Sequence, residues 1–303
     1  MTRRVAAGVM LVLVGGVAGA RDARPELVIP ADGVRSGSVA GVPARIRVDP
    51  SALGVPMLNP DLAARAGLKG GMIGLTYAVG PVEVKGRTAV TRIDLGRGPV
   101  KRRAGWAERA FAVGADGAVG PGGLPDPVIR FQLRASIAGE RTVALPMANG
   151  GGVFGGWGGT FATIDVGGGP IRVRFDPRRP TFATAGAGVA IAQGGGGMLE
   201  GAATRAEIRF GVERPVRAMR LARPLMIGPL AVDRLLVRVS DFGTASSIAD
   251  ADAAAADPDE VVVTAKGKRD RSNDMLTLGH DQLDRCSSIT FDKPAKRIRL
   301  TCA

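Results

Sequence analysis

The chain has 303 residues and a formal net charge of +13, from 41 Lys and Arg against 28 Asp and Glu. Aromatic side chains make up only 4% of it, too few for the stacking platforms of nucleic-acid-binding proteins, so the excess charge favours solvated strand faces over a nucleic-acid partner. With 45 glycines, 20 prolines, many Val, Ile and Thr, and no long stretch of helical periodicity, the composition predicts a mostly β protein with few short helices.

Residues 1–20 have the order of a secretory signal peptide. Two arginines precede an apolar run from Val5 to Val17, and small residues follow up to Ala20. The signal peptide would direct export to the periplasm, and its cleavage is expected after about Ala20. No later stretch contains the roughly 18 consecutive apolar residues of a membrane span, so the mature chain is expected not to span the membrane.

An internal repeat follows. Residues 43–50 read Pro-Ala-Arg-Ile-Arg-Val-Asp-Pro, and residues 170–177 read Pro-Ile-Arg-Val-Arg-Phe-Asp-Pro. Each copy predicts a short alternating strand, with arginines on one face and apolar residues on the other, that ends at Asp49 or Asp176. Asp-Pro also opens ordinary turns, and such alternation is typical of any half-exposed strand, so one copy alone would carry little. Two copies predict similar lobes whose aspartates could share a proton.

The mature length suits two lobes of about 120 residues, each with its own core. We expect an N-terminal lobe at 21–148, a Gly-rich interlobe linker at 149–160, and a C-terminal lobe at 161–303 with a flexible insertion at 244–271. The glycine clusters within 150–159 and 194–197 are followed by neither Lys-Ser/Thr nor a helix pattern. A linker or a hairpin turn is therefore favoured over a phosphate-binding loop at both clusters.

Two short helices are expected, one in each lobe. Residues 59–67 have Asn59 at a capping position, Pro60 at the first helical position and Gly67 as a stop. Residues 281–285 predict a single turn. The second halves of the lobes also correspond, because an apolar-apolar-Gly step is followed four residues later by a leucine and then by a strand. These matched features are the steps 118–120 and 277–279, Leu124 and Leu283, and the strands 128–131 and 289–291.

The two cysteines, Cys286 and Cys302, lie symmetrically about Pro294. In a hairpin that turns at this proline they become cross-strand neighbours, which predicts a disulfide in an oxidising compartment. A bridge closing a loop of this size would stabilise the fold by roughly 3 kcal/mol. Because no histidine or second cysteine pair lies near either sulfur in the sequence, neither a metal site nor a nucleophilic cysteine is expected, and no cofactor is predicted.

The order of these features resembles the retropepsin-like aspartyl proteases, most of all their bacterial, periplasmic, two-lobed members. The resemblance rests on the Asp-bearing strand, the helix ending Leu-Ala-Ala-Arg-Ala-Gly-Leu at 62–68, the long hairpin region, the apolar-apolar-Gly step and the closing hairpin, and it covers nearly all of residues 27–300. It implies two similar acid-protease-like β-barrel lobes with a cleft between them. It also implies that Asp49 and Asp176 form the catalytic pair. Tyr77, the only tyrosine, falls where a flap should cover the cleft; ordinary hairpin packing is the default interpretation, and a flap contact is the alternative.

The residues after each aspartate depart from the family motif, which reads Asp-Thr/Ser-Gly-Ala/Ser. Residues 49–52 read Asp-Pro-Ser-Ala, and residues 176–179 read Asp-Pro-Arg-Arg. Proline has neither a hydroxyl nor an N–H, so the hydrogen bonds that hold the family's loops together would be lost in both lobes. The adjacent arginines favour ionised carboxylates and oppose proton sharing. The loop neighbours of the pair that bear on activity are Pro50, Ser51, Pro177 and Arg178.

The sequence therefore predicts an exported aspartyl-protease-like protein that is degenerate and binds a peptide or an exported protein in its cleft without cleavage. One alternative is an active periplasmic aspartic endopeptidase, a hydrolase in which Asp49 and Asp176 act as general base and acid and titrate as a unit. A second alternative is a structural or assembly partner in the envelope that does not use the cleft.

A further segment bears on partners. Within the insertion, residues 259–265 read Asp-Glu-Val-Val-Val-Thr-Ala and are followed by the basic Lys-Gly-Lys-Arg at 266–269. The first part resembles the acidic-Val-Val-Val-Thr-Ala segment near the start of many TonB-dependent receptors. The segment is first expected to be a loop whose valines form an extra edge strand. Because an exposed β-prone run can also pair with the sheet edge of another protein, an envelope partner for 259–269 is the alternative.

Overall fold

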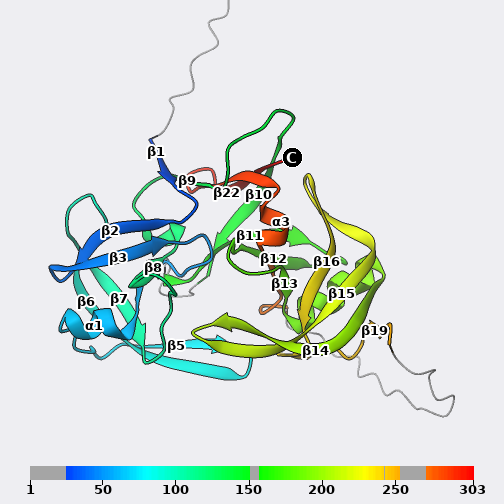
Figure 1. Cartoon of the computed structure of the whole chain (residues 1–303), viewed down its shortest axis with the longest axis horizontal. Coiled ribbons are helices and arrows are strands. Elements are labelled where there is room, and N and C mark those ends of the chain that lie inside the picture. Colours follow the sequence, from blue (N-terminus) through cyan, green and yellow to red (C-terminus); the bar gives the residue numbers. More distant parts are fainter. Residues whose placement is uncertain (1–24, 151–156, 242, 253–270) are drawn as a thin grey trace, which may run out of the picture.

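The computed structural model describes residues 25–150, 157–241, 243–252 and 271–303 (Figure 1). The protein is mostly β with a few short helices, as predicted from its composition. Its helical elements are α1 (Pro60–Arg65), η1 (Pro121–Gly123), α2 (Ala185–Gly195) and α3 (His280–Leu283). Within these described ranges, no helix is long and apolar enough to cross a membrane. The signal peptide expected at 1–20 lies outside the described residues.

The first lobe is a closed β-barrel with one strand added at its side. Its strands are β2 (Val34–Val39), β3 (Val42–Val48), β4 (Met57–Leu58), β5 (Gly74–Val79), β6 (Val82–Asp94), β7 (Val100–Ala107) and β8 (Gly117–Val119). They pair in the order β2-β3-β8-β4-β7-β6-β5, and β2 also pairs with β6, which closes the barrel. In β3 the apolar residues Ala44, Ile46 and Val48 are buried, so the expected alternation points one face into the core.

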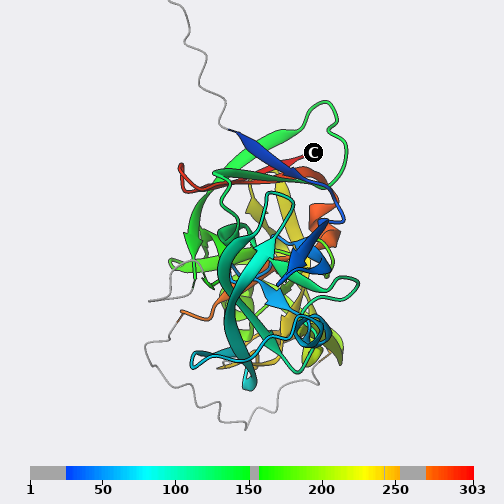
Figure 2. The ribbon, with the colours of Figure 1, turned by 90° about the vertical axis from the view of Figure 1, so that its left-hand side faces the viewer.

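The second lobe is built on a large sheet that also takes in strands from the first half of the chain. In sheet order its strands are β1 (Glu26–Ile29), β9 (Val128–Gln132), β21 (Cys286–Asp292), β22 (Arg297–Cys302), β10 (Arg141–Asn149), β11 (Thr160–Asp165), β12 (Pro170–Phe175), β20 (Met275–Leu278), β13 (Phe182–Ala183), β16 (Leu230–Arg238), β15 (Val212–Ile227), β14 (Gly197–Arg209) and β19 (Ala249–Asp250). A separate small ladder joins β17 (Ser240–Asp241) to β18 (Gly243–Thr244). In both views the strands β1 and β22 lie at the same end of the molecule (Figure 1, Figure 2).

The repeated sequence has the same strand pairing in both halves. In the first half, β3 is parallel to β8, β8 is antiparallel to β4, and β4 is parallel to β7. In the second half, β12 is parallel to β20, β20 is antiparallel to β13, and β13 is parallel to β16. The apolar-apolar-Gly steps end β8 and β20, so each forms the parallel neighbour of an Asp-bearing strand. This shared pairing places the two aspartates in equivalent surroundings.

The Gly-rich range at 149–160, expected as an interlobe linker, connects two neighbouring strands of the large sheet. The strands β10 and β11 pair antiparallel, with Asn149 opposite Thr160, and the Thr160 hydroxyl donates to the Asn149 side-chain oxygen at 2.9 Å. The two strands that flank this range are therefore antiparallel neighbours within one sheet. Composition cannot distinguish these two cases, because glycine suits a turn and a linker equally.

The structure also contains a helix that the sequence did not predict. Helix α2 is an Ala- and Gly-rich segment with buried residues around most of its circumference, so it lacks the one-sided periodicity that identifies a surface helix. It ends at Gly196, whose φ of 66° suits the left-handed conformation of a helix C-terminus. The cluster 194–197 therefore ends a helix and begins β14.

The insertion expected at 244–271 begins as ordered structure. Ala245 and Ile248 are buried in the main core, and β19 pairs in parallel with β14. This pairing adds an edge strand at the start of the range that was expected to be a flexible insertion. The partner segment proposed at 259–269 lies outside the described residues.

The predicted disulfide between Cys286 and Cys302 is present. The two cysteines are directly opposite each other across β21 and β22, and the turn at residues 293–296 separates these strands. Both cysteines are fully buried in the main core, and the chain has no other cysteine. The bridge therefore ties the last strand of the chain to its neighbour inside the large sheet.

Replacing both cysteines by serine should lower the free energy of unfolding by about 3 kcal/mol, because the bridge restricts the unfolded chain over a sequence separation of 16. The measurement is urea unfolding of the oxidised protein and of the double variant. Oxidised and reduced samples of the native sequence should differ by a similar amount. Equal midpoints for oxidised and reduced protein would contradict the prediction.

Candidate functional site

The structure brings Asp49 and Asp176 together, as the repeat predicted. Asp49 follows β3 and its N–H donates to the Val119 carbonyl at 2.9 Å; Asp176 follows β12 and its N–H donates to the Leu278 carbonyl, also at 2.9 Å. Both side chains are buried, at 1% and 0% exposure. The matched bonds fix each aspartate to the apolar-apolar-Gly step of its own lobe.

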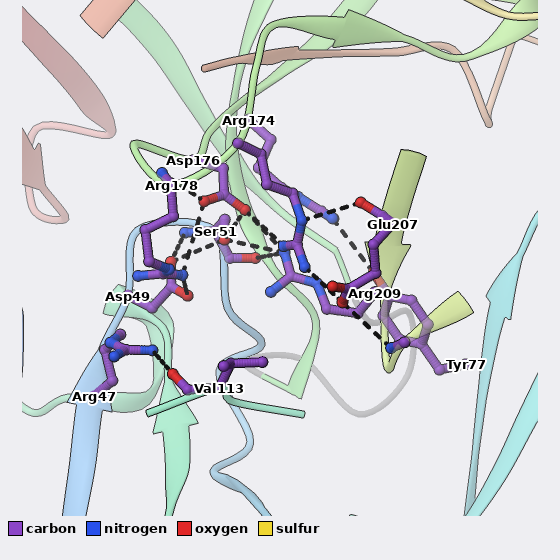
Figure 3. Close-up of polar contacts among 12 residues, drawn as sticks. Arg47, Asp49, Ser51, Tyr77, Val113, Arg174, Asp176, Arg178, Glu207 and Arg209 are labelled. Carbon is purple, nitrogen blue, oxygen red and sulfur yellow. Dashed lines mark hydrogen bonds and ion pairs between the residues drawn. The ribbon is translucent and has the colours of Figure 1, made fainter. Parts of the chain in front are cut away.

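Ser51 joins the two carboxylates (Figure 3). Its Oγ lies 2.8 Å from Asp49 Oδ1 and 3.1 Å from Asp176 Oδ2. A hydroxyl has one proton, so it donates to one carboxylate at a time. Because both carboxylates contact this one hydroxyl, the distance between Asp49 Oδ1 and Asp176 Oδ2 cannot exceed the sum of the two hydrogen-bond lengths. Ser51 therefore makes a hydrogen bond between the lobes despite the proline before it.

The proline in each loop is accommodated because the aspartate carboxylate accepts its hydrogen bond from the residue after the proline. The Ser51 N–H donates to Asp49 Oδ1 at 2.8 Å, and the Arg178 N–H donates to Asp176 Oδ1 at 3.2 Å. Both are local bonds from a backbone N–H two residues after the aspartate, as in Asx turns. Pro50 and Pro177 precede these donors and lack only the N–H that the loop does not use. The expected loss of loop hydrogen bonds is thus partly compensated.

Three guanidinium groups surround the pair. Arg178 Nη2 forms a close ion pair with Asp49 Oδ2 and lies 3.7 Å from Asp176 Oδ1. Arg179 Nη1 lies 3.1 Å from Asp176 Oδ2, and Arg209 Nη2 lies 3.7 Å from the same oxygen. Arg178 and Arg209 contact the carboxylates from opposite sides (Figure 3). Each carboxylate therefore has at least one cationic partner.

Arg209 is the residue of the site that sequence reasoning missed. It ends β14 and its side chain is only 5% exposed. Its Nη2 donates to Ser51 Oγ at 3.0 Å, and its guanidinium lies over the Phe111 ring, 5.0 Å from the centroid. The next residue, Phe210, has a φ of 56° at the hairpin turn. In the sequence, Arg209 is one of many arginines scattered along strands. It lies outside the repeated stretch that identified Asp49 and Asp176, so the repeat did not point to it.

The arginines decide the protonation of Asp176. Burial alone would raise the pKa of its carboxyl, but the positive charges of Arg209, Arg178 and Arg179 outweigh burial and lower the pKa below the usual aspartate value. The pKa of Arg209 changes in the opposite direction. Burial alone would lower it, but the neighbouring Tyr77, Asp176 and Asp49 outweigh burial and raise it. Asp176 and Arg209 are thus held as an ionised pair.

Tyr77, the expected flap residue, lies in the β5–β6 hairpin, and this hairpin reaches the second lobe. Its ring packs edge-on against Phe210, with centroids 5.4 Å apart, and its hydroxyl oxygen accepts a hydrogen bond from Arg174 Nη1 at 3.4 Å. Tyr77 and Asp176 line one pocket at the junction of the lobes. The aromatic contacts also show that Tyr77 takes part in hairpin packing.

Tyr77 should titrate well below an ordinary tyrosine. Burial would raise its pKa, but Arg174 and Arg209 outweigh burial and lower the pKa to about 8. Because Tyr77 is the only tyrosine in the chain, the tyrosinate absorbance reports this group alone. We expect a midpoint near pH 8 and a higher midpoint in Arg174→Gln, whereas Arg45→Gln serves as a matched control on an exposed arginine. A midpoint near the ordinary value of about 10 in the native protein would contradict the prediction.

The site offers no ligand set for a metal within the ranges that the structure describes, where no group of three or more His, Cys, Asp and Glu side chains gathers. The carboxylates that do approach each other are partnered by arginines. Comparison with family models and with curated proteins returns no match for this chain. The assignment of function therefore depends on the geometry of the site.

Proposed function

We propose that this chain is an exported, two-lobed protein of the aspartyl-protease type that binds a peptide or an exported polypeptide between its lobes without cleaving it. The duplicated strand pairing around two adjacent aspartates supports the aspartyl-protease assignment. The observation that carries the proposal is the partnering of both carboxylates by arginines, which separates this pair from a catalytic one.

Cleavage by a paired-carboxylate mechanism needs one carboxyl protonated and one ionised, so that a water is activated while the substrate carbonyl is polarised. Here Arg178 contacts both carboxylates, and Arg179 and Arg209 contact Asp176. These charges favour the ionised form of Asp176. Asp176 is then not the carboxyl that holds the shared proton, which supports binding without cleavage.

Two features favour a polypeptide as the ligand. The pocket that includes Asp176 has a volume of about 220 Å³ and lies where the β5–β6 hairpin of the first lobe meets the second lobe. Its lining combines polar groups with apolar ones, Val79, Phe182, Ile208 and Met275 among them, as a site for one peptide side chain requires.

Export to the periplasm is part of this proposal. The charged, apolar and small-residue order of residues 1–20 supports it. The buried disulfide between Cys286 and Cys302 supports an oxidising compartment independently. An envelope protein that binds the segment 259–269 remains a prediction from the sequence.

The test is incubation of the full chain with a diverse peptide library from about pH 3 to about pH 8, beside Asp49→Asn and Asp176→Asn. Mass spectrometry measures both cleavage and retention of peptides by the protein. We expect retention without cleavage at every pH. Cleavage that is lost in both variants would replace this proposal with an active aspartic endopeptidase. Neither retention nor cleavage would favour the structural role in the envelope.

A further inference from the structure

The pocket beside the aspartate pair is strongly basic. It is lined by four arginines from the second lobe, and the only carboxylate in its lining is Asp176. The exposed residues Ala78, Ser272 and Asn273 belong to the same lining, so the pocket is reached from the surface. The lining arginines are Arg172, Arg174, Arg209 and Arg238.

Two of these arginines are already neutralised, and two are not. Arg209 pairs with Asp176, and Arg238 pairs with Asp241. Among the described residues, neither Arg172 nor Arg174 has a carboxylate within ion-pair distance. Arg172 lies over the Phe161 ring, 4.9 Å from its centroid, and Arg174 donates to the Tyr77 hydroxyl oxygen. Within the part of the chain that the structure describes, the pocket therefore has an excess of positive charge that no carboxylate balances.

Buried donors in the lining also lack acceptors. The Nε atoms of Arg174 and Arg238 are buried and have no hydrogen-bond partner within the described part of the chain. The Arg238 side chain as a whole is only 6% exposed. A buried donor without an acceptor costs about 1–3 kcal/mol. Such donors next to unbalanced positive charge are the features that a bound anion would satisfy.

The repeat provides an internal comparison. Arg45 and Arg47 stand at the positions of β3 that correspond to Arg172 and Arg174 of β12. Arg45 is exposed, and Arg47 is satisfied by the Val113 carbonyl at 2.8 Å (Figure 3). In the second lobe, the corresponding strand arginines Arg172 and Arg174 line the pocket beside Asp176. The basic pocket is thus specific to one lobe and is not a general consequence of the repeated strand.

We propose that this pocket binds a carboxylate of the polypeptide ligand, either the side chain of a glutamate or aspartate or the terminal carboxylate, through Arg172 and Arg174. This inference rests on the proposed function, because it names the part of the ligand that the site recognises. Guanidinium groups form charge-assisted hydrogen bonds with carboxylates, and such bonds are strongest in partly buried sites. A pocket of about 220 Å³ admits one such side chain with a few waters.

The first test uses three small probes with the full chain: N-acetylglutamic acid α-amide, N-acetylalanine and the neutral N-acetylglutamine amide. The first probe carries a side-chain carboxylate, the second carries a terminal carboxylate, and the third carries no carboxylate. The readout is the tyrosinate absorbance of Tyr77, whose hydroxyl contacts Arg174. A carboxylate that neutralises Arg174 should raise the apparent pKa of Tyr77 by about half a unit or more. The neutral probe should leave it unchanged, and the difference between the two acids identifies the preferred source.

The second test measures peptide affinity by calorimetry. Arg172→Gln and Arg174→Gln should each weaken a peptide that carries a carboxylate by about tenfold or more, whereas the matched variant Arg45→Gln should leave its affinity unchanged. Circular dichroism checks that the variants fold.

The two proposals fail in different ways. Equal affinity for acidic and neutral peptides would overturn the carboxylate pocket and leave the proposed function standing. No shift of Tyr77 with any acidic probe would overturn it as well. A shift with the small acids and no affinity for any peptide would support the pocket and overturn the peptide as its ligand.

Discussion

Replacing Asp176 by asparagine is expected to lower the free energy of unfolding by about 3–5 kcal/mol. The change keeps the shape of the side chain and removes its charge, which leaves Arg209 buried at 4% exposure without its carboxylate. Arg178 and Arg179 also lose the ion pairs that they make with Asp176. Urea unfolding of the variant and the native chain measures the difference.

The matched control is Glu213→Gln, which removes one charge from the ion pair between Arg205 and Glu213. Both side chains of that pair are exposed, at 68% and 54%, so its loss should change stability by less than about 1 kcal/mol. If Asp176→Asn behaved like Glu213→Gln, the buried ion-pair network would not be a stabilising part of the fold.

Replacing Gly279 by alanine should cost about 3 kcal/mol or more, since a Cβ at this position overlaps backbone atoms. It would lie 2.1 Å from the Arg179 oxygen and 2.4 Å from the Thr181 nitrogen. These atoms cannot easily move, because the Thr181 N–H donates to Asp281 Oδ1 at 2.7 Å and the Gly279 N–H donates to Thr181 Oγ1 at 2.9 Å. Urea unfolding measures the loss.

Two further glycines test the reason for this loss. Gly120 occupies the equivalent step of the first lobe, where a Cβ would lie 2.2 Å from the Ala52 oxygen, so Gly120→Ala should be similarly destabilising. Gly194, in helix α2, has its nearest neighbour at 3.8 Å. Gly194→Ala should therefore stabilise the chain by about 0.5–1 kcal/mol through helix propensity. A neutral effect of Gly279→Ala would contradict the close backbone packing behind Asp176.

Much of the fold around the site could be predicted because the relevant signals are local. The alternation of residues 43–48 and 170–175 identifies the strands β3 and β12, and the proline at position 60 marks the start of α1. The spacing of Cys286 and Cys302 about Pro294 identifies the hairpin and the disulfide pair, whereas a β-bulge between Cys286 and Ser288 shifts the rest of the ladder by one residue. In each case a few neighbouring residues determine the geometry.

The features that escaped prediction depend on distant contacts. Helix α2 is buried by several strands, so its sequence shows no polar face. The range 149–160 lies between two strands that pair in one sheet, β10 and β11, and glycine content alone left a linker and a hairpin turn equally open. Arg209 reaches Ser51 from 158 residues away. Charge beside Asp176 was expected from Arg178 and Arg179, but the third arginine depends on where the β14–β15 hairpin folds.

The central claim is that Asp176 is held ionised by its arginines, and a carbon-13 NMR titration of the side-chain carboxyl of Asp176 tests it most directly. A lowered pKa means that the ion pair contributes stability that is present above the ordinary aspartate pKa and is lost as pH falls through the lowered value. We predict one transition for Asp176, below the ordinary range of aspartate, with no step at higher pH. A transition above about pH 4.5 would show a proton shared within the pair, and it would contradict the claim that the site is non-catalytic.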